Sequence, residues 1–200
     1  GDRIAVVNGR IILNGEEVPQ QVEPPVQIPA ADEQLCQGVR CLAAFERSAA
    51  RLYDALLSKL IGDSHNGHPA PRGMTEQRVL EIRNQEEMHL HMVTECIEEL
   101  GGDPTAQTPS ADLVGVESMG LVQAISDPRT TLVQCLHTTL TAEMVDVAGW
   151  ELLAQMAEGL GRTDMQERFL EALNHEEEHL ISVREWYTEM TLKESGGSYH

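Results

Sequence analysis

The chain of 200 residues is long enough to bury one full-sized hydrophobic core, and it carries 33 acidic against 14 basic residues, a formal charge of −19. Such a surface repels phosphate backbones and anionic lipids, so nucleic acid and membranes are disfavoured as partners. No stretch is apolar enough to span a bilayer, and no secretory signal opens the sequence. With four cysteines that form no Cys-x-x-Cys motif, these features predict a cytoplasmic protein with free thiols.

Residues 1–31 differ from the rest and predict an N-terminal hairpin followed by an extended, proline-rich arm. Ile4–Val7 and Arg10–Leu13 are β-rich runs joined by Asn8-Gly9, which is typical of a type I′ turn. Because an isolated hairpin is marginally stable in water, we expect this one to dock on the main body or on a second subunit.

From Asp32 onward the sequence predicts four long helices and hence an all-α domain over residues 32–192, with a short tail at 193–200. The first helix is expected from Asp32 to Ile61, where Gly62 ends it, and the second from the N-cap Thr75 to Leu100. A connection of nearly thirty residues follows, with some helix expected at 113–126.

Asp127-Pro128 is expected to open the third helix, which runs to Leu160, and Thr163-x-x-Gln166 predicts a capping box for the fourth helix, which ends near Leu192. Short links make antiparallel pairs of helices one and two and of helices three and four. The long link suits a four-helix bundle with a single crossover connection between helices two and three.

Residues 175–179 read His-Glu-Glu-Glu-His and match H-E-x-x-H, the usual pattern of a zinc protease helix. Such an enzyme needs a third ligand downstream and a substrate-binding strand, and the only later histidine is the terminal His200. The zinc-protease interpretation is therefore disfavoured.

An internal repeat explains the motif better. Glu86-x-x-His89 on the second helix matches Glu176-x-x-His179 on the fourth, and the first and third helices each carry a glutamate followed seven residues later by an aromatic residue: Glu46 with Tyr53, and Glu143 with Trp150. Each of these polar groups lies on a mainly apolar helical stripe. Buried carboxylates need compensation, and two divalent cations would supply four positive charges against four carboxylates.

This set of residues resembles the ligand set of the ferritin-like di-iron carboxylate proteins, which include bacterioferritin, rubrerythrin and manganese catalase. The resemblance covers roughly residues 32–192, and stretches 127–132 and 148–153 resemble an uncharacterised bacterial group of ferritin-like domain proteins. It implies that Glu86 and Glu176 bridge two metal ions, that Glu46 and Glu143 bind one ion each, and that His89 and His179 each complete one ion. Iron is the implied metal, with manganese as the alternative.

Other candidates are weaker. Asp146, one turn after Glu143, is either an additional carboxylate of the site or a solvated acid or N–H acceptor. His175 is expected in a supporting or surface position, and Tyr53 is expected to fill the core, with a redox role as the alternative. The remaining histidines are expected to be solvated or packed; they are His65, His68, His91 and His137.

The resemblance implies a di-iron protein that reacts with O₂ or peroxide, as a ferroxidase or peroxidase. The alternatives are a non-enzymatic metal-binding or stress-related bundle and, third, a manganese catalase. No Cys-x-x-Cys marks an internal electron donor, so the donor is expected to be external, and a homodimer is the most economical assembly.

Overall fold

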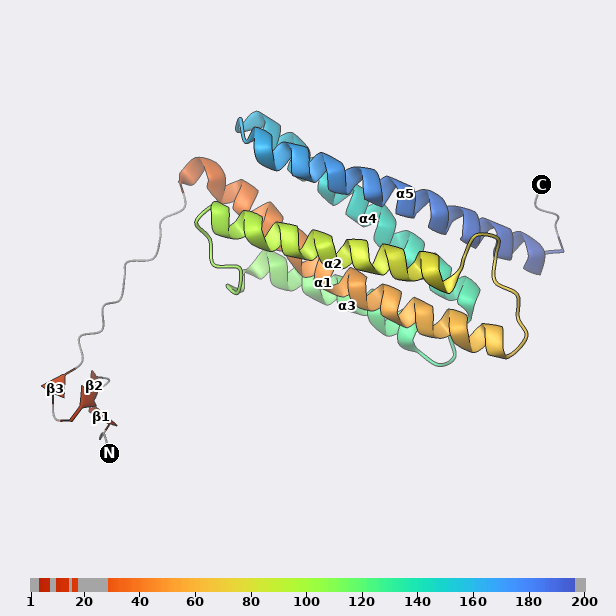
Figure 1. The fold of residues 1–200 in the computed structure, drawn as a ribbon, viewed down its shortest axis with the longest axis horizontal. Coiled ribbons are helices and arrows are strands. Elements are labelled where there is room, and N and C mark those ends of the chain that lie inside the picture. Colours follow the sequence, from red (N-terminus) through yellow and green to blue (C-terminus); the bar gives the residue numbers. More distant parts are fainter. Residues whose placement is uncertain (1–3, 8–9, 15, 18–28, 197–200) are drawn as a thin grey trace.

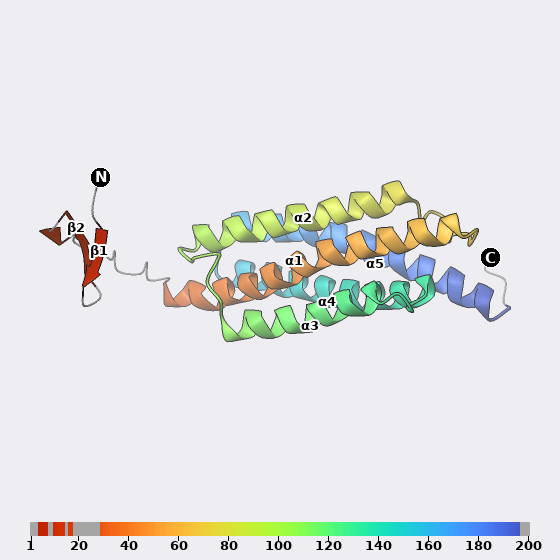
Figure 2. The ribbon, with the colours of Figure 1, turned by 90° about the horizontal axis from the view of Figure 1, so that it is seen from below.

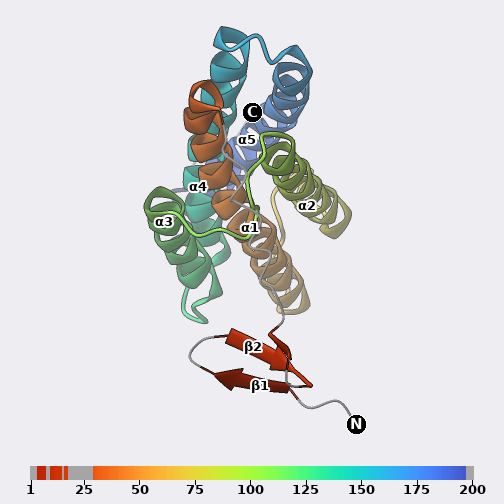
Figure 3. The same cartoon turned by 90° about the vertical axis from the view of Figure 1, so that its left-hand side faces the viewer.

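The computed structural model describes residues 4–7, 10–14, 16–17 and 29–196. The main body is a helical bundle of α1 (Ala30–His65), α2 (Glu76–Glu99), α3 (Pro109–Ser126), α4 (Leu132–Gly159) and α5 (Thr163–Glu194). Figure 1 shows these helices lying side by side along the long axis, and Figure 3 shows the bundle from one end. The all-helical fold predicted from the sequence is thus confirmed at the level of a helical bundle.

The strands β1 (Ile4–Val7), β2 (Arg10–Leu13) and β3 (Glu16–Glu17) form a small antiparallel sheet in that order. Within the described residues the strands contact one another and no helix, and docking of the hairpin on the main body or on a second subunit stays a prediction. The turn residues 8–9 and most of the arm lie outside the described residues, so the predicted hairpin arm stays a prediction.

The helices pack as two hairpins, α1 with α2 and α4 with α5, which meet mainly through α1 and α4. The long connection between α2 and α4 contains α3, which packs on the outside of the bundle against α1 and α4 (Figure 2). By traversing the bundle, α3 brings the chain to the far end before α4 begins. Apolar side chains from all five helices form one continuous core.

Two predicted helix ends and one predicted capping box are wrong. Helix α1 continues through Gly62 to His65, because the N–H of Asn66 bonds the carbonyl oxygens of Gly62 and Asp63 and completes the last turn. Helix α4 begins at Leu132 instead of Pro128, since Asp127 Oδ1 accepts the N–H of Arg129 in a turn before the helix.

The capping box lies at Thr131 and Gln134, at the start of α4, where each side chain accepts the backbone N–H of the other residue. The capping box predicted at Thr163 does not form, because Thr163 is already inside α5 and Arg162 is the residue before the helix. Thr75 caps α2 as predicted, by accepting the N–H of Arg78.

None of the helices in the described part of the chain combines the length and the apolar character needed to cross a lipid bilayer. All four cysteines are free thiols.

Candidate metal centre

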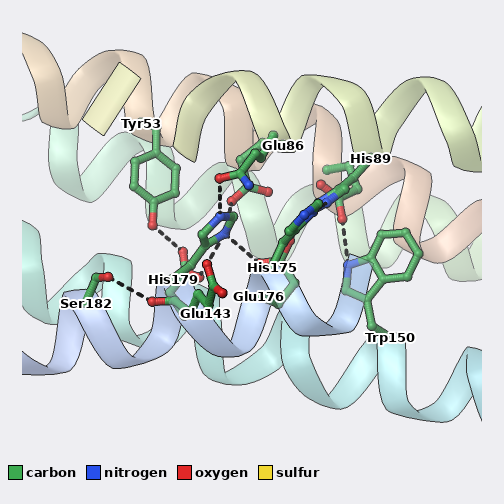
Figure 4. A network of polar contacts seen from close by, with 12 residues as sticks. Tyr53, Glu86, His89, Glu143, Trp150, His175, Glu176, His179 and Ser182 are labelled. Atoms are coloured by element: carbon green, nitrogen blue, oxygen red, sulfur yellow. Dashed lines mark hydrogen bonds and ion pairs between the residues drawn. The ribbon is translucent and has the colours of Figure 1, made fainter. Parts of the chain in front are cut away.

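The six side chains singled out by the repeat meet in the middle of the bundle, between the two helical hairpins (Figure 4). They are at most 3 % exposed; the six are Glu46, Glu86, His89, Glu143, Glu176 and His179. The periodicity explains this burial, because residues 81–90 and 171–180 show the same order of buried, partly buried and exposed positions. The two Glu-x-x-His motifs therefore point inward in the same way from α2 and α5.

The six residues divide into two overlapping groups of ligand atoms. One contains Glu46 and His89, the other contains Glu143 and His179, and both contain Glu86 and Glu176. Within each group the ligand atoms lie within 4.8 Å of one another. Such a group of carboxylate oxygens and an imidazole nitrogen can hold a metal ion, and the shared glutamates would then lie between two ions. Their role as ligands stays a prediction.

His89 and His179 present the same ring nitrogen to the carboxylates. His89 Nδ1 lies 2.7 Å from Glu176 Oε1, and His179 Nδ1 lies 3.1 Å from Glu176 Oε2 and 3.3 Å from Glu86 Oε1. The other ring nitrogens face outward: His179 Nε2 lies 2.9 Å from Gln85 Oε1, and His89 Nε2 lies 3.2 Å from His175 Nδ1. With its Nε2–H donated to Gln85, His179 turns Nδ1 toward the carboxylates, where this nitrogen would offer its lone pair to a metal ion.

Glu46 and Glu143 each accept a hydrogen bond from an aromatic residue of the other helical hairpin. Tyr53 on α1 donates a 2.6 Å hydrogen bond to Glu143 Oε1 on α4, and the indole N–H of Trp150 on α4 donates a 3.0 Å bond to Glu46 Oε1 on α1. Glu46 and Glu143 are thus each oriented by the aromatic residue from the other half of the repeat. Tyr53 and Trp150 occupy equivalent positions in the two halves of the repeat and make equivalent hydrogen bonds.

Several buried polar atoms of the centre have no hydrogen-bond partner among the described residues. They are Oε2 of Glu46, Oε2 of Glu86, Oε2 of Glu143 and Oδ1 of Asp146. Three further atoms have only the imidazole–carboxylate contacts given above: Nδ1 of His89, Oε1 of Glu86 and Oε1 of Glu176. Unpaired buried carboxylate oxygens are costly, and native structures rarely tolerate so many together. The donor set thus fits divalent cations, which would satisfy these atoms directly.

The electrostatics reflect this excess of acid. Burial, followed by repulsion from neighbouring carboxylates, raises the pKa of Glu46 and of Glu143 well above the ordinary value. Burial opposes a charged His179, but hydrogen bonds to Glu176 and Glu86 outweigh it and raise the pKa of His179 to about 10. Burial likewise disfavours an ionised Glu176, yet the bonds from His179 and His89 lower its pKa to about 2. Within the protein alone, a protonated His179 takes part of the role of a cation.

Asp146 and His175 lie beside the centre, outside both groups of ligand atoms found among the described residues. Asp146 is 2 % exposed, so the alternative of a solvated acid is wrong. Its pKa is raised well above the ordinary value by burial and by the charges of Glu176 and Glu86. His175 stacks on His89, with ring centroids 5.5 Å apart, and supports that ligand from outside.

Gln85 is the functional residue that sequence reasoning missed. In the repeat, Gln85 occupies the position equivalent to that of His175. The same alignment contains the needed signal, because the residue before each Glu-x-x-His motif contacts the histidine of the other motif. Among the described residues, the histidines outside the repeat are exposed, and these are His65, His68, His91 and His137.

The fold and the site together define a helical-bundle protein with paired, buried carboxylate–histidine clusters that can hold metal ions. In comparisons with known proteins, no family model, no curated protein and no solved structure matches the chain.

Proposed function

We propose that this protein is a ferritin-like di-metal protein whose two metal ions, most plausibly iron, react with O₂ or hydrogen peroxide. The observation that carries the proposal is the division of six buried ligands into two overlapping groups that share Glu86 and Glu176. A pair of ferrous ions, when bound, would supply the two electrons that, with two protons, reduce one hydrogen peroxide to two waters.

The chain's own residues bind, orient and shield. Glu46 with His89 and Glu143 with His179 would each hold one ion, while the shared glutamates keep the ions close together. The complete burial of Glu46, Glu86, Glu176 and His179 excludes bulk water. Tyr53 holds a proton on its hydroxyl, 2.6 Å from Glu143 Oε1, within reach of the centre.

Mixed carboxylate and imidazole donors suit iron or manganese. Sites that select zinc or copper are more often rich in thiolates. The four free cysteines lie outside both groups of ligand atoms. Iron is the metal that connects this donor set with O₂ and peroxide chemistry in the ferritin-like proteins that the sequence resembles.

Metal content and reactivity test the proposal. Full-length protein loaded anaerobically with ferrous iron should bind two ions per chain. Peroxide or O₂ should then oxidise these ions, and the absorbance of ferric iron measures the reaction. The variant E86Q/E176Q should bind neither ion, whereas E177Q, which alters an exposed neighbouring glutamate, should behave as wild type.

The other outcomes discriminate the alternatives. Two manganese ions with oxygen evolution from peroxide would favour a manganese catalase. Two bound ions without oxidation by peroxide or O₂ would favour a non-enzymatic metal-binding bundle. A chain that binds no divalent metal would refute the proposal.

A further inference from the structure

A second candidate site lies on the outside of the bundle, between α1 and α3. It is a groove of about 1110 Å³ that is also lined by residues 104–107 of the α2–α3 connection. It shares no residue with the metal-ligand groups. Figure 2 shows α3 lying along α1 on the side of the bundle away from α2 and α5.

One wall of the groove carries three arginines from a single helical face. Arg40, Arg47 and Arg51 on α1 are spaced by seven and four residues, which places them on one stripe. At 1.5 Å per residue, the spacings along the helix axis are about 10 Å and about 6 Å. The groove thus presents guanidinium groups over about 16 Å of its length.

These arginines lack the acidic partners that most other cations of the bundle have. The chain has 33 acidic residues, and in its described part six arginines and Lys193 form ion pairs with carboxylates; the arginines are Arg72, Arg78, Arg83, Arg129, Arg162 and Arg168. Within the described residues, none of the three groove arginines forms one, although Asp112 also lines the groove.

The three arginines differ in what they already contact. Arg40 donates to the carbonyl oxygens of Asp103 and Ala106 and so fixes the α2–α3 connection. Arg51 reaches only the sulfur of Met119, at 4.0 Å, and Arg47 has no hydrogen bond or ion pair in the described part of the chain. Two guanidinium groups one turn apart are therefore available to an acidic group of a ligand.

Much of the remaining lining is small or apolar, and polar side chains such as Ser48, Gln107 and Gln123 also line the groove. Ala43, Ala44 and Gly115 contribute little volume, while Val116 and Met119 provide apolar surface on the α3 side. A Cβ atom added at Gly115 would meet nothing within 4 Å, so the groove is open there. The volume exceeds what a single phosphate or carboxylate needs and is that of a site for an organic molecule.

We propose that this groove binds a small organic anion with acidic groups at both ends of an apolar or neutral middle. Arg47 and Arg51 bind one acidic group, Arg40 binds the other with its remaining N–H donors, and the middle lies over Gly115 and Val116. The acidic groups are carboxylates or phosphate monoesters. Each offers two oxygen atoms to which one guanidinium group can donate a pair of parallel hydrogen bonds.

Titration calorimetry on the full-length chain tests the proposal with defined probes. Suberate, an eight-carbon dicarboxylate, and fructose 1,6-bisphosphate represent the two acid types, and octanoate, with one carboxylate, is the control ligand. At least one of the two dianions should bind more tightly than octanoate, and the stronger one identifies the acid type. Binding of both dianions no tighter than that of octanoate would overturn the proposal.

Two kinds of variant locate the binding. R47A/R51A should weaken the dianion at least about tenfold, whereas R78A/R83A, which removes the same charge from α2, should leave the affinity within about twofold. G115L fills the groove without altering charge and should also weaken binding at least about tenfold. Because leucine favours a helix more than glycine does, G115L should unfold no more easily than wild type. Dianion binding that R47A/R51A and G115L leave unchanged would show that the ligand lies elsewhere.

Discussion

The Tyr53 hydroxyl on α1 donates a 2.6 Å hydrogen bond to Glu143 Oε1 on α4, although the two residues are 90 positions apart in the sequence. Trp150, seven residues after Glu143, returns a bond of the same kind to Glu46, seven residues before Tyr53. The exchange ties the two helical hairpins together at the centre of the bundle. The terminal carboxylates are therefore positioned by the fold itself before any ligand arrives.

Removal of the Tyr53 hydroxyl should destabilise the protein and disturb one half of the centre. In Y53F, Glu143 Oε1 loses its donor in a fully buried environment, so the free energy of unfolding in urea should fall by about 1–3 kcal/mol. Y187F alters a partly buried tyrosine of α5 and should cost less than about 0.5 kcal/mol. Equal effects of the two variants would show that the Tyr53–Glu143 bond does not support the centre.

The pH dependence of the metal-free protein follows from the raised pKa values at the centre. Glu46 and Glu143 keep protons in the folded state that they lose in the unfolded state above their ordinary pKa of 4.5. His179, with a pKa of about 10, keeps a proton that the unfolded chain loses above 6.5. In each case the folded state binds more protons, so stability falls as pH rises.

Metal-free protein should therefore unfold at a higher urea concentration at pH 5.5 than at pH 8.5. E46Q removes one buried acid and should therefore flatten this pH dependence. It should also raise the stability of the metal-free protein at pH 8.5. Metal binding should become weaker in the same variant. Urea unfolding at both pH values measures the effect. A wild-type midpoint that rises with pH across this interval would contradict the assignment of the raised pKa values.

The residues before the two Glu-x-x-His motifs should each influence one metal position. Gln85 contacts His179 and His175 contacts His89, so Q85A and H175A each remove the outer partner of a different ligand. Outer partners of this kind are typically worth 10–100-fold in metal affinity.

Titration with Co²⁺, followed by its visible absorbance, should resolve this effect. One of two binding steps should weaken in each single variant, and both should weaken in Q85A/H175A. H175Q retains an amide oxygen that can accept from His89 Nε2–H and should recover most of the loss. If Q85A and H175A weaken the same step, the division of the six ligands into two groups is wrong.

Periodicity predicted the helices, and the repeat predicted which inward positions meet, because a residue's phase on a buried stripe fixes the direction of its side chain. Helix ends were less predictable. Asp127-Pro128 and Thr131-x-x-Gln134 are both plausible starts for α4, and only the path of the chain out of α3 decides between them. The partners across the hairpins, such as Gln85 with His179, depend on how two separate helices are rotated against each other. The groove likewise depends on where α3 packs.

Glu189 anchors the far end of α5 to the α1–α2 connection. Its Oε2 accepts the backbone N–H of Arg72 at 3.1 Å, and its Oε1 accepts from Lys193. The hydrogen bond from Lys193 lowers the pKa of Glu189, burial opposes it less strongly, and the hydrogen bond from the Arg72 backbone lowers the pKa further.

A lowered acid pKa gives stability that is present above the ordinary value of 4.5 and is lost as pH falls. E189Q should therefore unfold more easily than wild type at pH 7, with the difference shrinking toward pH 3. E194Q, an exposed acid of the same helix, should show no such difference. Circular dichroism, recorded across an acid titration, measures the unfolding of E189Q and E194Q. A constant difference between E189Q and wild type at all pH values would show that lost packing, not lost charge, is responsible.

The close approach of α1 and α4 should make Gly38 sensitive to an added side chain. A Cβ atom at Gly38 would lie 2.8 Å from Leu153 Cδ2, whereas one at Gly62 on the same helix would meet nothing within 4 Å. In a helix, alanine is otherwise favoured over glycine by about 1 kcal/mol. G62A should therefore stabilise the protein by up to about 1 kcal/mol.

G38A carries the same helical gain but must displace Leu153, and overpacking of a core costs about 1–3 kcal/mol. We expect G38A to lower the free energy of unfolding while G62A raises it, both measured by urea denaturation of metal-free protein. The double variant G38A/L153A gives the added methyl group room and should lose the clash, although the truncated leucine has its own cost. A double variant whose destabilisation equals the sum of the two single effects would show that Gly38 and Leu153 are not in contact. The two helical hairpins would then pack differently where α1 meets α4.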